Sequence, residues 1–157
     1  MSTGFATRCL RLAAMSGLSV AMLVSPIAVA ADTGGGGNAD LGLNAITITK
    51  TTVAGRTGVV TVTGSVDCSQ DVNGYVDISV SQVVGRLNTI YGEGYTEFQC
   101  LAANGSAPFS LSVSPYSGKF AGGSATIAGY AEAFVCTDVE CFKDSVSVGP
   151  TSVRLSH

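Results

Sequence analysis

Residues 60–68 read VTVTGSVDC and have the pattern of a β-strand. The valines all share one parity, while the positions between them carry threonine, serine and aspartate. Successive side chains of a β-strand point to opposite faces of the sheet, so this alternation predicts a strand with one buried face and one small, polar face. The stretch VDISVSQVV at residues 76–84 repeats the pattern. Neither stretch has the period of a helix.

Apolar alternation of this kind recurs along the rest of the chain, between turn-forming residues that come about every ten residues, a spacing typical of a sandwich or barrel. We therefore predict an all-β protein, an antiparallel immunoglobulin-like β-sandwich of about seven to eight strands with two disulfides. Gly92-Glu93-Gly94 is interpreted as one of the turns. Gly149-Pro150 is interpreted as another, or as a break within the last strand, because proline cannot donate to a central ladder.

The first 30 residues have the pattern of a cleaved secretory signal. Arg8 and Arg11 precede an apolar run over residues 12–24, and Ala28-Val29-Ala30 supplies small residues before a cleavage site. The alternative is a membrane anchor, but the apolar run is shorter than the roughly 20 residues that span a bilayer. We predict that residues 1–30 are a signal peptide and that the mature protein is secreted into the extracellular space.

The predicted mature chain is acidic and carries few charges. Charged residues make up 12% of the sequence, and the formal charge is −3. Loss of two arginines with the signal leaves 6 basic against 11 acidic residues, a charge of −5. This sign argues against a nucleic-acid partner. Residues 31–40 contain four consecutive glycines and predict a flexible tether, and residues 41–157 predict one folded domain, which we expect to be a monomer that does not bind membranes.

Cysteine spacing predicts the disulfides. Removal of the signal takes away Cys9 and leaves four cysteines. Cys136 and Cys141 flank a loop of hairpin length, and Cys68 and Cys100 each lie on the inward parity of a predicted strand. We therefore favour the pairs 68–100 and 136–141 among the three connectivities. A zinc site is the alternative, but it needs two close pairs and only one is present.

Strand and turn motifs over residues 61–155 resemble a family of small secreted proteins of actinobacteria. The motifs that carry the resemblance are VTGSVDC at 62–68, VDISVSQ at 76–82, FSLSVSP at 109–115 and VRL at 153–155. The resemblance implies a secreted β-sandwich and brings no activity with it.

The pair Cys136 and Cys141, with Thr137 after the first cysteine, is similar to the disulfide-tipped hairpin of the neocarzinostatin-type apoproteins. These are secreted immunoglobulin-like sandwiches that hold an apolar chromophore in a cleft. In that family the other disulfide closes a short loop, whereas Cys68 and Cys100 are far apart, and this chain has no tryptophan. The resemblance therefore implies the fold more than ligand binding.

Few residues are suited to catalysis. His157 is the only histidine and the last residue, and terminal side chains are usually mobile. Paired cysteines supply no thiolate nucleophile. The carboxylate pairs Glu93 with Glu97 and Asp138 with Glu140 lie beside predicted turns, so we interpret them as solvated charges and not as a glycosidase pair. We predict that the protein is not an enzyme and has no cofactor.

Two groups of carboxylates are candidate calcium ligands, because calcium prefers oxygen. The candidate groups are Asp67 with Asp71, and Asp138 and Glu140 with Asp144. No DxDxDG-like loop accompanies either group, so we predict no metal site.

Aromatic residues are the candidate binding residues. Tyr91 and Tyr95 bracket the predicted turn at Gly92-Glu93-Gly94, where an amphipathic ring beside glycine suits a contact surface. Phe134 and Phe142 flank the predicted disulfide hairpin. Two functions follow as hypotheses. The first is a secreted module that binds a protein or a cell-envelope component, and the second is a carrier of a small apolar ligand in an intersheet cleft.

Overall fold

The structure is a computed structural model and describes residues 40–86, 88–136 and 138–157. The predicted signal peptide, and the tether up to residue 39, lie outside the described residues. The described chain is built of seven β-strands, one of which runs through Pro150 where the sequence left an eighth strand open. The strands are β1 (Leu43–Val53), β2 (Val60–Cys68), β3 (Val72–Val84), β4 (Asn88–Cys100), β5 (Ser106–Pro115), β6 (Gly123–Cys136) and β7 (Cys141–Leu155).

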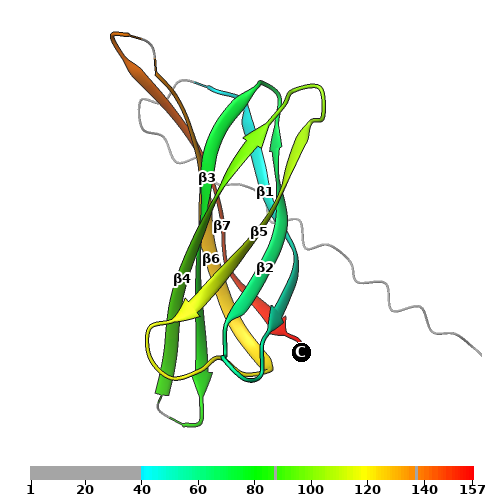
Figure 1. Cartoon of the computed structure of the whole chain (residues 1–157), viewed down its shortest axis with the longest axis vertical. Coiled ribbons are helices and arrows are strands. Elements are labelled where there is room, and N and C mark those ends of the chain that lie inside the picture. The colour runs from blue at the N-terminus through cyan, green and yellow to red at the C-terminus, as the bar shows by residue number, and fades with distance from the viewer. Residues whose placement is uncertain (1–39, 87, 137) are drawn as a thin grey trace, which may run out of the picture.

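The strands pair antiparallel in the order β1-β2-β5-β4-β3-β6-β7 and curl into a nearly closed barrel (Figure 1). The link between β4 and β5 is short, with only the pairs Gly92 to Pro115 and Glu93 to Ser114. At the other end of the order, β7 comes beside β1 through a parallel bridge between Thr52 and Ser156. The prediction of an all-β antiparallel fold is confirmed, while the sheet closes further than two separate layers would.

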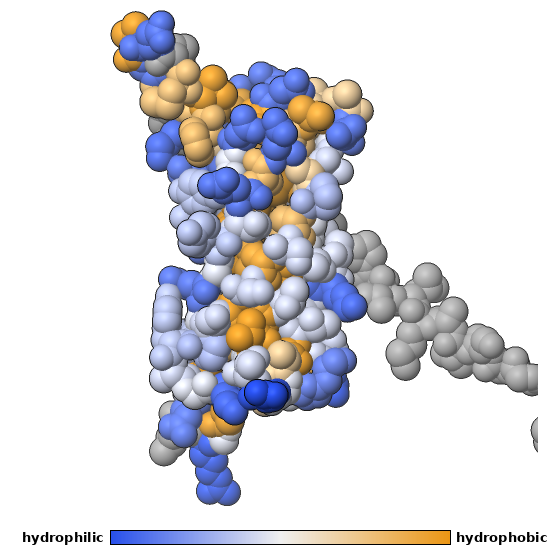
Figure 2. All heavy atoms as spheres, in the orientation of Figure 1, coloured by the Kyte–Doolittle hydropathy of each residue, from blue (hydrophilic) through white to orange (hydrophobic). Residues whose placement is uncertain are grey.

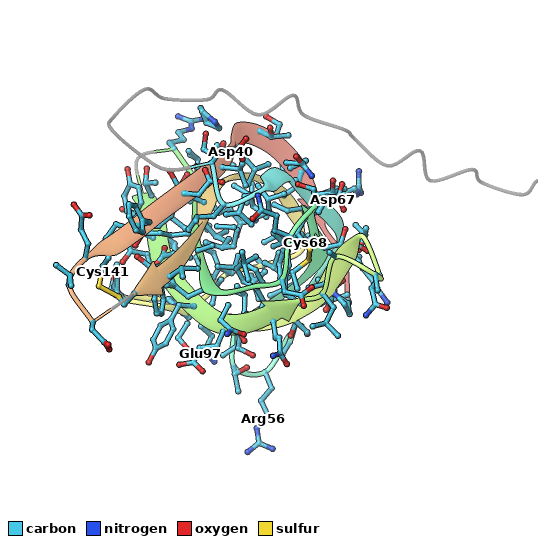
Figure 3. All side chains as sticks on the ribbon, turned by 90° about the horizontal axis from the view of Figure 1, so that it is seen from above. Asp40, Arg56, Asp67, Cys68, Glu97 and Cys141 are labelled. Carbon is cyan, nitrogen blue, oxygen red and sulfur yellow. A yellow bond between two sulfur atoms is a disulfide. The ribbon has the colours of Figure 1, made fainter. Side chains whose placement is uncertain are left out.

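The inward-pointing side chains of the strands fill the inside of the barrel. The inward residues of β2 and β3 are almost completely buried, and Figure 3, which looks down on the barrel, shows side chains filling its centre. Every second residue therefore contributes to one apolar core, and the residues between them form the outer surface. The largest fully buried aliphatic side chains are Ile46, Val60, Val62, Val66, Val76, Ile78, Val80, Val113, Ile127 and Leu155.

Both predicted disulfides are present. Cys68 and Cys100 join β2 to β4 across the interior, with their Cα atoms 6.3 Å apart, although β5 lies between these strands in the sheet order. Both cysteines are buried. Cys136 and Cys141 face each other in register at the tip of the β6–β7 hairpin, which projects beyond the barrel (Figure 1).

The predicted turn at Gly92-Glu93-Gly94 is wrong, because these residues lie inside the unbroken strand β4. A side chain at Gly94 would place its Cβ 2.3 Å from the carbonyl oxygen of Ser112 on β5. The glycines therefore mark the place where two backbones approach closely. Gly149-Pro150 likewise lies within β7, opposite a register irregularity between Ile127 and Gly129 of β6.

A side chain completes the contact between β7 and β1. Oδ2 of Asp144 accepts hydrogen bonds from the backbone N–H groups of Leu41 and Leu43, each at 3.1 Å. At the far end of β1, the N–H of Val53 donates to the carbonyl oxygen of Ser156 at 2.7 Å. Asp144 was considered as a calcium ligand in the sequence, and the structure gives it this role in closing the barrel.

Removal of the two disulfides should have unequal effects. In the chain-entropy model, the 32-residue separation of Cys68 and Cys100 corresponds to about 3 to 4 kcal/mol, and the short hairpin loop to about 2 kcal/mol. We expect the Cys68→Ala/Cys100→Ala variant to lose more free energy of unfolding in urea than the Cys136→Ala/Cys141→Ala variant. Equal losses, or a larger loss for the hairpin pair, would contradict the importance of the cross-core link.

Replacement of Asp144 should weaken the seam of the barrel. Asp144→Ala leaves two part-buried N–H groups, that of Leu41 just before β1 and that of Leu43 in β1, without their acceptor, which we expect to lower the free energy of unfolding by about 1 to 3 kcal/mol. Asp138→Ala removes an exposed carboxylate from the same hairpin and serves as the control, with an expected change within about 0.5 kcal/mol. Equal urea midpoints for the two variants would show that Asp144 does not hold the seam.

Candidate functional site

On the outer face of β3, β4 and β6, the strand register aligns side chains in rows that run across the three strands. Asn73 on β3 pairs with Gln99 on β4 and Phe134 on β6. Two residues further along β3, Tyr75 lies between Glu97 and Glu132, and then Asp77 lies between Tyr95 and Tyr130. Aromatic, amide and carboxylate side chains thus meet on neighbouring strands of a paired sheet.

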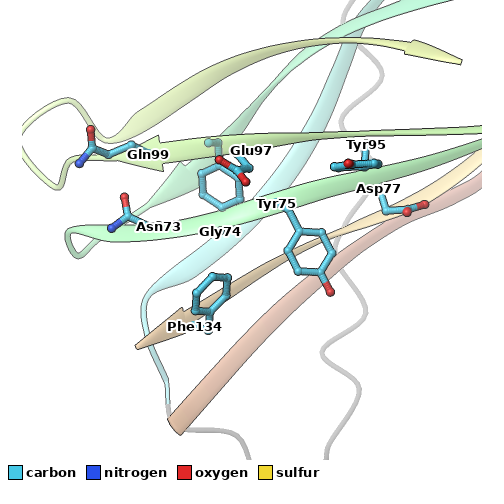
Figure 4. A pocket seen from close by; sticks show the side chains of 9 residues that line it. Asn73, Gly74, Tyr75, Asp77, Tyr95, Glu97, Gln99 and Phe134 are labelled. Atoms are coloured by element: carbon cyan, nitrogen blue, oxygen red, sulfur yellow. The ribbon is translucent and has the colours of Figure 1, made fainter. Parts of the chain in front are cut away.

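A surface depression of about 730 Å³ lies over these rows, at the end of the barrel near the β6–β7 hairpin. Rings contributed by three strands, those of Tyr75, Tyr95 and Phe134, lie around it (Figure 4). Its polar groups are the carboxamides of Asn73 and Gln99 and the carboxylates of Asp77 and Glu97.

Tyr75 is the fixed ring of the depression. Its hydroxyl donates to Oε1 of Glu132 at 3.1 Å, and the same oxygen receives Nζ of Lys143 at 2.9 Å. The rings of Tyr75 and Tyr130 meet edge to face, with their centroids 5.9 Å apart. The hydrogen bond with Tyr130, followed by burial and by the bond to Glu132, raises the pKa of Tyr75. The phenol therefore stays protonated and holds its position at physiological pH.

Carboxylates crowd the far side of the same face. Partial burial, together with the charge of Glu93, raises the pKa of Asp77 above its ordinary value. The hydroxyl of Tyr116 donates to Oε2 of Glu93, and this hydrogen bond raises the pKa of Tyr116. Asp77 itself has no side-chain hydrogen bond among the described residues, so its charge is held on this face without a partner.

Other polar side chains of the depression also lack a hydrogen-bond partner among the described residues. Within the described residues, the side chains of Asn73, Gln99, Tyr95 and Glu97 make neither hydrogen bonds nor ion pairs with other side chains or with the backbone. The ring of Tyr95 is 75% exposed. A ligand in the depression therefore meets donors and acceptors that no neighbouring residue has to release.

The structure brings two of the four predicted binding residues together. Tyr95 and Phe134 both line the depression. Tyr91 lies on the same outer face of β4, two pleats away from Tyr95, and does not line it. Phe142 pairs with Val135, whereas Phe134 pairs with Lys143, so Phe134 and Phe142 point to opposite faces of the hairpin.

The hairpin tip forms a second exposed apolar surface. Val139 is 93% exposed, and Val135 and Phe142 are also open to solvent. Orange spheres mark apolar residues in this projecting tip in Figure 2. Asp138 and Glu140 flank Val139, so the tip combines a small apolar group with acidic neighbours.

The sequence did not indicate Asn73, Asp77 and Gln99 as members of a site. The available signal was the polar parity of β3 and β4, which runs through these residues, but a single strand cannot show which side chains lie beside one another. His157 lies beside Gly55 and Gly122, at the opposite end of the barrel from the depression. The structure thus keeps the only histidine apart from the carboxylates Asp77 and Glu97.

Residues 40–86, 88–136 and 138–157 contain no group of three or more histidine, cysteine, aspartate or glutamate side chains arranged to hold a metal ion. The same residues include no helix of the length and apolarity that a membrane crossing needs. Comparison of the chain with protein-family models, curated proteins and solved structures found no match.

Asp77 provides a test of the electrostatics of this face. Because folding raises its pKa, stability from its protonation is present below the ordinary pKa of 3.8 and is lost as the pH rises through the folded pKa. We therefore expect Asp77→Asn to be more stable than the parent protein at neutral pH, with the gain vanishing in acid. Urea unfolding at both pH values measures this.

A double variant tests whether Glu93 contributes to the raised pKa of Asp77. In a Glu93→Gln background, the gain from Asp77→Asn should be smaller, because the neighbouring charge is already gone. Loss of stability from Asp77→Asn at neutral pH would contradict the interpretation.

Proposed function

We propose that this chain is a secreted, non-enzymatic binding module that recognises a protein or a cell-envelope component through the outer face of β3, β4 and β6. The depression supports this proposal, because exposed rings lie there beside polar side chains that have no hydrogen-bond partner among the described residues. Binding sites combine an apolar surface with a few placed polar groups in this way. The two disulfides are compatible with an extracellular location.

We also propose that the fold is an immunoglobulin-like sandwich in which β4 connects the two sheets. The order β1-β2-β5-β4 followed by β3-β6-β7 corresponds to the two sheets of immunoglobulin constant domains. Here β4 pairs along its whole length with β3 and only briefly with β5. Because β4 pairs mainly with β3, the strands β4, β3, β6 and β7 form a four-stranded sheet. The outer face of this sheet carries the depression.

The alternative function, a carrier of a small apolar ligand between sheets, has less support. Buried side chains such as Val62, Ile78 and Ile127 fill the interior, and the depression lies outside it. Phe134 and Phe142, which motivated the carrier hypothesis, point to opposite faces of the hairpin. Native mass spectrometry after incubation with an apolar cell extract separates the two functions, because a carrier would keep an adduct.

A retention experiment tests the binding module. The mature protein, labelled at its N-terminus, is incubated with washed envelope fractions and with culture proteins of the producing cells. We expect retention that falls at least about tenfold in a Tyr95→Ala/Phe134→Ala variant, since buried aromatic contacts dominate most interfaces.

Val139→Ser is the matched control, because it alters the exposed hairpin tip and leaves the depression intact. It should be retained like the parent protein. Retention lost in the control and kept in the Tyr95 and Phe134 variant would move the binding surface to the hairpin tip. An absence of retention above that of an unrelated secreted β-sandwich would contradict the proposed function.

A further inference from the structure

We propose that the depression over β3 binds a neutral oligosaccharide. In this proposal, which rests on the proposed function, the rings of Tyr95 and Phe134 lie against apolar faces of the sugars. The carboxamides of Asn73 and Gln99 exchange hydrogen bonds with the hydroxyl groups. The occupant is thus a glycan chain of the kind that cell envelopes present, and no part of the proposal requires a reaction.

The lining chemistry matches a ligand that is apolar on its faces and polar at its edges. Tyr75, Tyr95 and Phe134 supply flat apolar surface, and each carboxamide of Asn73 and Gln99 offers two donors and an acceptor. The carboxylates of Asp77 and Glu97 add acceptors only. A pyranose ring has C–H groups on its faces and hydroxyl groups around its edge, so it can satisfy both sets at once.

Strand register argues against an extended peptide as the occupant. Peptides that add to a sheet need an unpaired strand edge for their backbone hydrogen bonds. The depression lies over β3, which pairs with β4 on one side and with β6 on the other through the whole stretch from Asn73 to Asp77. Only side chains are offered to a ligand here, which favours one recognised by ring contacts and side-chain hydrogen bonds.

Charge narrows the class of glycan. The outer face carries the carboxylates of Asp77, Glu93, Glu97 and Glu132, and the nearby cation, Lys143, is already paired with Glu132. An anionic sugar polymer would meet repulsion from these groups. A purely apolar ligand would strip water from Asp77 and Glu97 without replacing its hydrogen bonds, which is costly. A neutral sugar avoids both costs because its hydroxyl groups donate to the carboxylates.

The site is preorganised on one side and adaptable on the other. Tyr75 is held by Glu132 and by the ring of Tyr130, whereas Tyr95 extends into solvent. Lining side chains that already stand on paired strands lose less entropy on binding than those of a loop. The volume of about 730 Å³ lies within the usual range for small-ligand sites, roughly 300 to 1,000 Å³, so a short segment of a longer chain fits.

Isothermal titration of the mature protein with defined oligosaccharides tests the proposal. The probes are a neutral β-glucan hexasaccharide, an N-acetylglucosamine hexasaccharide and an oligogalacturonate as the anionic comparison. We expect binding of at least one neutral probe and a much weaker response to the anionic one. Tyr95→Ala should weaken that binding about tenfold, as should Asn73→Ala/Gln99→Ala.

Tyr91→Ala is the matched control, since Tyr91 is an exposed tyrosine on the same face of β4 that does not line the depression. Its affinity should stay within about twofold of the parent, and equal urea midpoints for all variants confirm that each is folded. Equal loss in Tyr91→Ala and Tyr95→Ala, or tighter binding of the anionic probe, would overturn the assignment of the site or of the ligand class.

Envelope fractions separate failure of this inference from failure of the proposed function. Retention by protease-treated envelope that a glycan-digesting enzyme abolishes supports the oligosaccharide. Retention that protease treatment abolishes, with no response to any sugar probe, would overturn the inference and leave a protein partner for the module. No retention by either fraction would contradict both.

Discussion

The alternation of side chains between the two faces of each strand determines both the core and the outer surface of this protein. Half of every strand must point inward, and in β2 and β3 that half is mostly valine and isoleucine. The buried polar side chain there is Gln82, whose amide donates to the backbone carbonyl oxygens of Ala121 and Ser124. The outward half is therefore where we propose that binding takes place. Near the hairpin end of β3, β4 and β6 the outward residues include tyrosine, phenylalanine, amides and carboxylates, and this is where the depression lies. A packed core and a chemically rich outer face are two results of one pattern.

Closure of the barrel keeps that face in shape. A seven-stranded antiparallel order would leave β1 and β7 as open edges, which are prone to pair with other chains. Here Asp144 binds the backbone of β1 at one end, and Ser156 bridges to Thr52 at the other. The buried Cys68–Cys100 link ties β2 to the end of β4, directly after Gln99. The strand that carries Tyr95 and Glu97 is therefore anchored by a covalent bond at the edge of the depression.

The sequence predicted what depends on local pattern and missed what depends on neighbours. Period-two alternation predicted the strands, and cysteine spacing predicted both disulfides, because both features follow from the order of residues in the chain. Gly92 and Gly94 were misinterpreted as a turn, since a close approach of β5 selects glycine just as a turn does. Tyr95 and Phe134, which the sequence suggested as single residues, both line the depression. Their meeting with Asn73 and Gln99 depends on the register between strands, which no single stretch reveals.

We propose that ligands bind to the outer face, while the protein's own side chains fill the interior. The most direct test is NMR mapping of backbone amide shifts in isotope-labelled protein comprising residues 31–157 as a solubilised envelope glycan fraction is added. We expect the amide shifts to change at residues 73–77, at residues 95–99 and around Phe134, and to stay unchanged in β1 and β2. Perturbations centred on inward residues such as Val62 and Ile78, or on the β1-β2-β5 face, would contradict the proposal.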